Sequence, residues 1–117
     1  MAKILLIDDS WLSRRAMANM IGEFGHEIIE AENGIEGLEK LKETDPDCVF
    51  LDLLMPEMDG YQVLAELNKQ KIKTPVVVCS ADIQETAKNE CLQLGAIDFI
   101  NKPPSDNDIL QVLKKIL

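Results

Sequence analysis

Five short apolar runs alternate with five segments of helical periodicity along the whole chain. The runs cover residues 3–7, 27–31, 48–51, 75–80 and 97–101, and each has the length of a strand. Between them, apolar residues recur every three or four positions, which is the spacing of one helix face. Alternation of this kind predicts an α/β domain in which helices cover both faces of a doubly wound, five-stranded parallel sheet.

The expected helices carry start and stop signals. Each start is a residue that commonly caps a helix, in four cases with a polar partner three positions later. The starts are Ser10, Asn33 with Glu36, Asp59 with Gln62, Asp82 with Glu85, and Ser105 with Asp108. Gly25 and Gly95 stand where the first and fourth helices should stop. Two apolar stripes should face the core: Met17, Met20, Ile21 and Phe24, and Ile109, Val112, Leu113 and Ile116.

The make-up of the runs predicts their order in the sheet. Residues 4–7, 49–51 and 76–78 are unbroken apolar runs, as central strands are. Residues 27–31 and 97–101 contain charges, which suits edge strands. The resulting order is 2-1-3-4-5, as in flavodoxin-like sheets. It places a topological switch point between strands one and three, where ligands bind at the carboxyl ends of the strands.

Composition narrows the class of protein. The 117 residues should form one domain over residues 1–117, and 46% hydrophobic residues can build a core without disulfides. Three cysteines without metal-ligand spacing, and the lack of a signal peptide, predict a cytoplasmic protein. No apolar run approaches the ~20 residues of a membrane span, so we expect no membrane insertion. A net charge of −9 argues against direct nucleic-acid binding.

Candidate chemistry stands at the ends of the expected strands. Asp8 and Asp9 follow the first strand, Asp52 follows the third, Ser80 ends the fourth and Lys102 follows the fifth. The first and third strands flank the switch point, so the three carboxylates should converge in one pocket. Clustered carboxylates repel one another unless a cation neutralises them, and their oxygens suit Mg²⁺. The lysine could hold a phosphate or the Asp52 carboxylate.

This set of groups suits phosphoryl transfer onto Asp52. The aspartate would attack as nucleophile while the metal and Lys102 neutralise charge on the transferring group. Each group also has a purely structural explanation: Asp8 and Asp9 could cap a helix, Ser80 could simply end a strand, and Lys102 could be an ordinary surface lysine. The residues come from four separate segments, which makes the combination more specific than any one motif.

At these residues the chain resembles the receiver domain of two-component response regulators, most closely the stand-alone chemotaxis (CheY-like) type. The resemblance covers the whole chain. It rests on Ile7-Asp8-Asp9-Ser10, on LDLLMPEMDG from Leu51 to Gly60, on Val78-Cys79-Ser80-Ala81, and on Asp98-Phe99-Ile100-Asn101-Lys102-Pro103. It implies a phosphoprotein that acts as a signalling switch rather than a metabolic enzyme.

The resemblance also implies roles for the acidic residues. Asp52 would accept the phosphoryl group from a phosphohistidine on a partner histidine kinase. Asp9 and Asp52 would ligate Mg²⁺ directly, Asp8 mainly through water, and the backbone carbonyl of Leu54 would supply another oxygen. A phosphatase could be a further partner.

The switch would follow from the remaining residues of the pattern. Lys102 would bind the phosphoryl group, and a cis bond to Pro103 would point it into the pocket. Ser80 would move to hydrogen-bond the phosphoryl group. Phe99 would change rotamer with it, although ordinary core packing explains Phe99 equally well. The face formed by the fourth helix, fifth strand and fifth helix would then change its affinity for an output protein.

Some positions depart from the commonest form of the family. Ser80 replaces a frequent threonine but keeps the hydroxyl, and Phe99 lacks the hydroxyl of the chemotaxis tyrosine. Pro104 stands where an aromatic residue often follows. Leu54 and Asp82 occupy positions that tune the lifetime of the phosphoryl group. The output and the lifetime therefore stay open, and a role in chemotaxis or motility is one expectation.

Rival functions fit less well. An unphosphorylated pseudo-receiver would usually have lost one of Asp8, Asp9, Asp52 and Lys102. A haloacid-dehalogenase-like phosphatase needs a second acidic residue where Leu54 stands, and a cap. A flavodoxin-like cofactor carrier would place phosphate against the acidic pair, which would repel it. The chain is interpreted as a single-domain regulator, with a receiver from a longer response regulator as the alternative.

Overall fold

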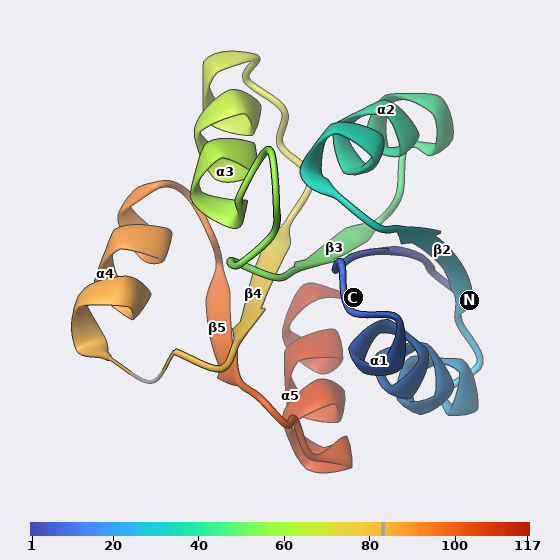
Figure 1. The fold of residues 1–117 in the computed structure, drawn as a ribbon. Coiled ribbons are helices and arrows are strands. Elements are labelled where there is room, and N and C mark those ends of the chain that lie inside the picture. The colour runs from blue at the N-terminus through green and yellow to red at the C-terminus, as the bar shows by residue number, and fades with distance from the viewer. Residues whose placement is uncertain (83) are drawn as a thin grey trace.

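The computed structural model describes residues 1–82 and 84–117, and these contain one parallel sheet. Its strand order is β2-β1-β3-β4-β5, which confirms the expected 2-1-3-4-5 order (Figure 1). The strands are β1 (Lys3–Ile7), β2 (Glu27–Ala31), β3 (Cys48–Leu51), β4 (Val76–Ser80) and β5 (Asp98–Asn101). The fourth and fifth begin one residue later than predicted; Pro75 has no N–H with which to extend the ladder.

In the described residues, four helices connect successive strands and a fifth follows β5. They are α1 (Trp11–Glu23), α2 (Gly34–Thr44), α3 (Gly60–Lys69), α4 (Glu85–Gln93) and α5 (Asp106–Ile116). The first and fourth stop where predicted, because Gly25 and Gly95 adopt φ angles of 86° and 106° that favour glycine. Among the helices of the described ranges, none has both the length and the apolar character to cross a membrane.

The helices form two layers around the sheet (Figure 1). Along β1, Ile4 and Leu6 face the layer made by α1 and α5, whereas Leu5 and Ile7 face the layer made by α2, α3 and α4. Both expected apolar stripes pack here: Met17, Ile21, Ile109, Val112 and Leu113 are buried, and Met20, Phe24 and Ile116 are partly buried against them. The sheet is therefore covered on both sides, as predicted.

Side-chain caps start four of the five helices where the sequence predicts. Asp59 with Gln62 and Ser105 with Asp108 form reciprocal capping boxes, and Ser10 and Asn33 each accept one backbone N–H.

The predicted start of the fourth helix at Asp82 is wrong. Helix α4 is capped by Gln84, whose side chain makes no cap hydrogen bond. The Asp82 carboxylate instead accepts the Gln84 N–H at 3.0 Å, ahead of the helix. The Asp82 carboxylate is thus already hydrogen-bonded before the helix begins and does not cap it.

Candidate functional site

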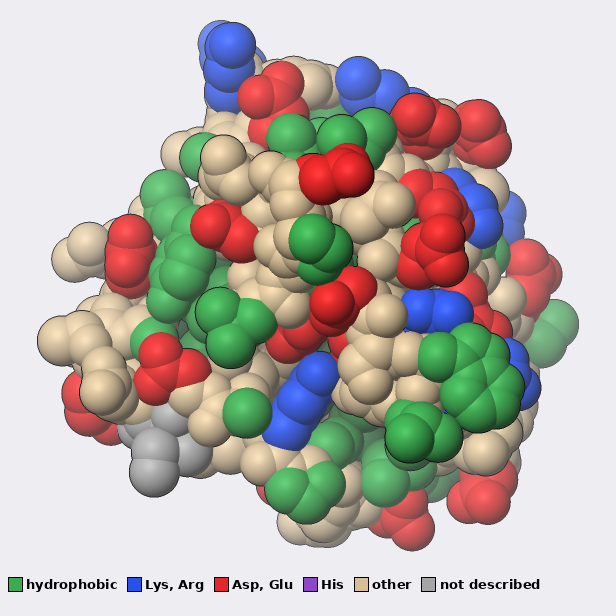
Figure 2. Space-filling view, in the orientation of Figure 1, with side chains coloured by type: hydrophobic (Ala, Val, Ile, Leu, Met, Phe, Trp, Pro, Cys, Tyr) green, Lys and Arg blue, Asp and Glu red, His purple; other side chains and the backbone are tan. Residues whose placement is uncertain are grey.

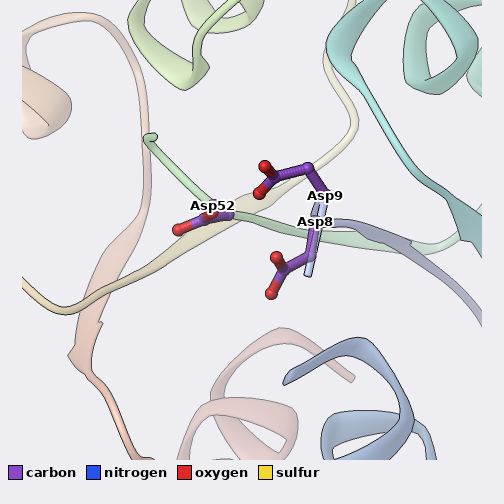
Figure 3. A group of neighbouring side chains, drawn as sticks. All are labelled: Asp8, Asp9 and Asp52. Atoms are coloured by element: carbon purple, nitrogen blue, oxygen red, sulfur yellow. The ribbon is translucent and has the colours of Figure 1, made fainter. Parts of the chain in front are cut away.

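Three carboxylates meet at the carboxyl ends of the two central strands. Asp8 and Asp9 follow β1 and Asp52 follows β3, and one oxygen from each lies within 4.8 Å of the others. Figure 3 shows the three side chains extending to the same side from the two strand ends. Acidic side chains also gather near the centre of the face in view in Figure 2, with a basic one beside them. The expected convergence at the switch point is present.

Backbone hydrogen bonds hold these residues in register. The Asp8 N–H donates to the Ala31 carbonyl at 3.1 Å, and the Asp52 N–H donates to the Ile7 carbonyl at 2.9 Å. The sheet ladder thus continues one residue past each strand. One Asp8 carboxylate oxygen also accepts the Ser10 N–H at 2.9 Å, where the chain turns into α1. Both aspartates therefore stand on rigid elements rather than on a free loop.

Lys102 reaches the same cluster from the end of β5. Its backbone N–H donates to the Ser80 carbonyl at 2.8 Å, and its peptide bond to Pro103 is cis. The lysine Nζ donates to Asp8 Oδ2 at 2.8 Å and lies 3.4 Å from Asp52 Oδ1. The Lys102 side chain is 18% exposed, against 8% for Asp8 and 11% for Asp52. A single ammonium group thus faces two sheltered carboxylates.

The electrostatics of the site leave negative charge uncompensated. Burial raises the pKa of Asp52 from 3.8 to about 6; Lys102 opposes this rise, whereas Asp8 and Asp9 add to it. Burial lowers the pKa of Lys102, but the hydrogen bond that Lys102 donates to Asp8 and the charges of Asp52 and Asp8 outweigh this effect, so the net pKa is raised. The lysine stays charged while one carboxylate is only weakly acidic.

The residues present fit a divalent cation. Asp8, Asp9 and Asp52 offer hard carboxylate oxygens close enough together to share one ion, which is the donor chemistry that Mg²⁺ prefers. A cation would also relieve the repulsion that weakens Asp52 as an acid. The Asp9 side chain is exposed, and with Leu54 it lines a shallow hollow that is open to solvent. An ion can therefore reach the cluster from this side.

The loop that follows Asp52 folds back and packs closely against the Asp52 backbone. The Gly60 N–H donates to the Leu53 carbonyl at 2.8 Å, and a Cβ on Gly60 would lie 2.5 Å from the Asp52 carbonyl oxygen. No side chain fits in that space. Gly60 ends the motif that begins at Leu51, but no role was predicted for it; its place at the helix start after Asp59 was the available signal. The Leu54 side chain is 70% exposed and points away from the core.

Ser80 and Phe99 lie on the strands beside the cluster. Ser80 is buried at the end of β4, and its hydroxyl accepts the Asp82 N–H at 3.1 Å. Phe99, on β5, is partly buried against the core and lines a groove of about 380 Å³ between α4 and α5. The side chains that lie together in the cluster are thus Asp8, Asp9, Asp52 and Lys102. The Ser80 hydroxyl instead bonds the backbone that follows β4.

Two further residues near the site lie on α1. Trp11 is 63% exposed at the start of this helix. Arg14, for which no role was predicted, is buried, and its guanidinium donates to the Asp8 carbonyl at 2.7 Å. The spacing of Arg14 from Asp8 along the expected helix was a weak signal of this contact. The adjacent Arg15 looks equivalent in the sequence, so the spacing could not single out Arg14.

Comparison with known proteins places these features in one family. The sequence model described as "Response regulator receiver domain" matches residues 4–114. The chemotaxis protein CheY of Listeria monocytogenes is 38% identical over 116 residues, which cover 98% of this chain and 98% of that protein. A protein-glutamate methylesterase/protein-glutamine glutaminase of Treponema denticola is 46% identical over 105 residues, covering 86% of this chain and 28% of that protein.

Solved structures agree on the fold. The chemotaxis protein CheY4 of Vibrio cholerae superposes with a TM-score of 0.91 at 28% identity, covering 100% of this chain and 99% of that one. The expected CheY-like, flavodoxin-like architecture is therefore confirmed.

Proposed function

This chain belongs to the family of response regulator receiver domains of two-component signalling, and from that premise we propose that Asp52 is its phosphoacceptor. Domains of this family interact with histidine kinases and effectors and are signalling proteins, not metabolic enzymes. In our proposal the kinase presents a phosphohistidine, and Mg²⁺ assists the transfer.

The observation that carries this proposal is the partnership of Asp52 with Lys102 inside an acidic cluster. The Asp52 carboxylate has one cationic neighbour, 3.4 Å away, and two further carboxylates within 4.8 Å. In the reaction, a carboxylate oxygen of Asp52 bonds to phosphorus, the P–N bond of the phosphohistidine breaks, and the imidazole nitrogen keeps the electron pair. The carboxylate must be ionised to attack, and with a pKa of about 6 it is ionised at neutral pH.

The other site residues would support that attack. Asp9 and Asp52 would hold the metal directly, Asp8 through water, and the Leu54 carbonyl would complete the set. When bound, Mg²⁺ supplies positive charge that neutralises the phosphoryl oxygens. Lys102 lies within reach of Asp52 without leaving Asp8, so it can turn its remaining N–H bonds toward a phosphoryl oxygen.

We further propose that phosphorylation is read out on the α4–β5–α5 face. Ser80 would exchange its bond from the Asp82 N–H for one with the phosphoryl group, which would loosen the turn leading into α4. Phe99 lines the groove on this face and packs against the core, so its packing would respond. An output protein would then bind by a shift in population between two states. The similarity to CheY supports a chemotaxis or motility pathway.

The test is intact mass spectrometry after incubation with acetyl phosphate and Mg²⁺. We expect the mass of one phosphoryl group to be added, with no addition in EDTA or in the Asp52→Asn variant. Asp47→Asn is the matched control: Asp47 precedes the opposite end of β3 and is exposed, and its carboxylate accepts the Lys3 N–H. It should be phosphorylated normally. An unmodified wild type, also after incubation with a histidine kinase, would favour a pseudo-receiver.

A further inference from the structure

A buried arginine ties the acidic cluster to the edge of the sheet. The Arg14 guanidinium uses two different nitrogens on two different elements. Its Nη1 donates to the backbone carbonyl of Asp8 at 2.7 Å, and its Nε donates to Glu30 Oε1 at 2.9 Å. Asp8 directly follows β1, Arg14 lies on α1 and Glu30 lies on β2, so one side chain joins three segments beside the site.

This fork also lies directly under the phosphoacceptor. A narrow cavity of about 10 Å³ beneath the cluster is lined by Arg14 together with Asp8, Asp52 and Lys102. The Arg14 side chain is 10% exposed, so its bonds are sheltered from water. Sheltered, charge-assisted hydrogen bonds are stronger and more directional than exposed ones. The bond to Asp8 is therefore well placed to hold the first residue of the acidic pair.

We propose that Arg14 is a positioning residue for the metal site: by holding the Asp8 carbonyl, it sets where the Asp8 and Asp9 carboxylates stand. This inference rests on the proposed function only through Mg²⁺ binding. Groups that orient ligands without touching the ion typically contribute 10–100-fold in affinity. Arg14 acts through the backbone of Asp8, so it contacts neither the ion nor the phosphoryl group.

The chain offers a matched control in the adjacent arginine. Arg15 bonds the other oxygen of the same carboxylate, Glu30 Oε2, at 2.6 Å, but its side chain is 44% exposed. Replacing each arginine by lysine keeps the net charge. A lysine at position 14 cannot serve both acceptors as the planar guanidinium does, because its single ammonium lacks the fork. Any difference between the two variants therefore reports on position rather than charge.

The experiment is a Mg²⁺ titration followed by the ¹H–¹⁵N NMR signals of Asp8, Asp9 and Asp52. Arg14→Lys should bind Mg²⁺ about tenfold more weakly than wild type, and Arg15→Lys within about twofold. With acetyl phosphate as donor, Arg14→Lys should need about tenfold more Mg²⁺ to reach half its maximal rate. That maximal rate should stay near the wild-type value. A merely structural defect would weaken the NMR signals of the folded protein, but those signals would still shift at the Mg²⁺ concentrations that the wild type needs.

Three outcomes overturn the inference. Equal Mg²⁺ affinities for Arg14→Lys and Arg15→Lys would show that the fork does not position the cluster. If Arg14→Lys does not fold, Glu30→Ala tests the same anchor: an affinity no weaker than that of Arg15→Ala would refute the role. A wild type that binds no Mg²⁺ would overturn this inference and the metal-assisted function together. Mg²⁺ binding without phosphorylation would refute only the proposed function. The Mg²⁺ affinities of Arg14→Lys and Arg15→Lys would then still test the positioning role of Arg14.

Discussion

Replacing the proposed phosphoacceptor by its amide should make the protein more stable, and the gain should depend on pH. Asp52 has a pKa of about 6 in the folded protein against an ordinary value of 3.8, so its ionised form destabilises the fold. Each pKa unit corresponds to about 1.4 kcal/mol, which sets an upper limit of about 3 kcal/mol. Solvent screening at the open site reduces the expected gain for Asp52→Asn to about 1–2 kcal/mol.

The pH dependence follows from the direction of the shift. Above pH 6, Asp52 is ionised in both the folded and unfolded states, and the full cost is present. Between pH 6 and 4, the folded protein takes up the proton first, so the cost fades. Below about pH 4, the carboxyl is neutral in both states, and the amide brings no advantage. We therefore expect the gain at pH 8 to disappear at pH 4.

The assay is urea denaturation followed by circular dichroism in EDTA at pH 8 and at pH 4. Asp47→Asn, which changes an exposed carboxylate, should alter the unfolding free energy by less than about 0.5 kcal/mol at either pH. Saturating Mg²⁺ should stabilise the wild type more than Asp52→Asn. It should therefore reduce the difference in unfolding free energy between the two proteins at pH 8. A variant that is no more stable than wild type at pH 8, or that gains equally at pH 4, would refute the electrostatic reasoning.

Three further predictions follow from packing, charge and capping. Gly60→Ala should lower the unfolding free energy by about 1–2 kcal/mol and slow phosphorylation, because its Cβ would press on the Asp52 carbonyl. Gly22→Ala, whose Cβ would meet nothing within 4 Å in α1, should be neutral or stabilising by up to about 1 kcal/mol in the same urea assay. Lys102→Met should cost about 2 kcal/mol at pH 7, since it leaves two buried carboxylates without their ammonium partner, and less at pH 4, where Asp52, with its raised pKa of about 6, becomes protonated; denaturation at both pH values checks the sign. Gln84→Ser should stabilise by about 0.5–1 kcal/mol, because it supplies the side-chain cap that α4 lacks, and an unchanged melting temperature would contradict this.

Local sequence signals were enough to predict the sheet. The order of the strands follows from which runs are wholly apolar, since a strand covered on both faces cannot carry the charges of β2 and β5. That order alone brings Asp8 and Asp52 together, because both follow strands at the switch point. The central part of the site is therefore a consequence of topology.

Features that depend on a competition between partners could not be predicted. Asp82 was expected to cap α4, but its carboxylate can accept the N–H of either residue 84 or residue 85, and spacing cannot choose between them. Arg14 and Arg15 are adjacent and chemically identical, yet only one turns under the site. The choice depends on the rotation of α1 against the sheet, which long-range packing decides.

The same contrast bears on the proposed switch. Its rigid part is built from sheet hydrogen bonds and from the arginine fork, and these hold Asp8 and Asp52 in place. Its adjustable part is Ser80, whose hydroxyl accepts the Asp82 N–H ahead of α4. A phosphoryl group on Asp52 would compete for that one hydroxyl, and one hydrogen bond contributes only about 1 kcal/mol. The turn before α4 can therefore change partner at a low cost, while the residues that would perform the chemistry stay where the fold has placed them.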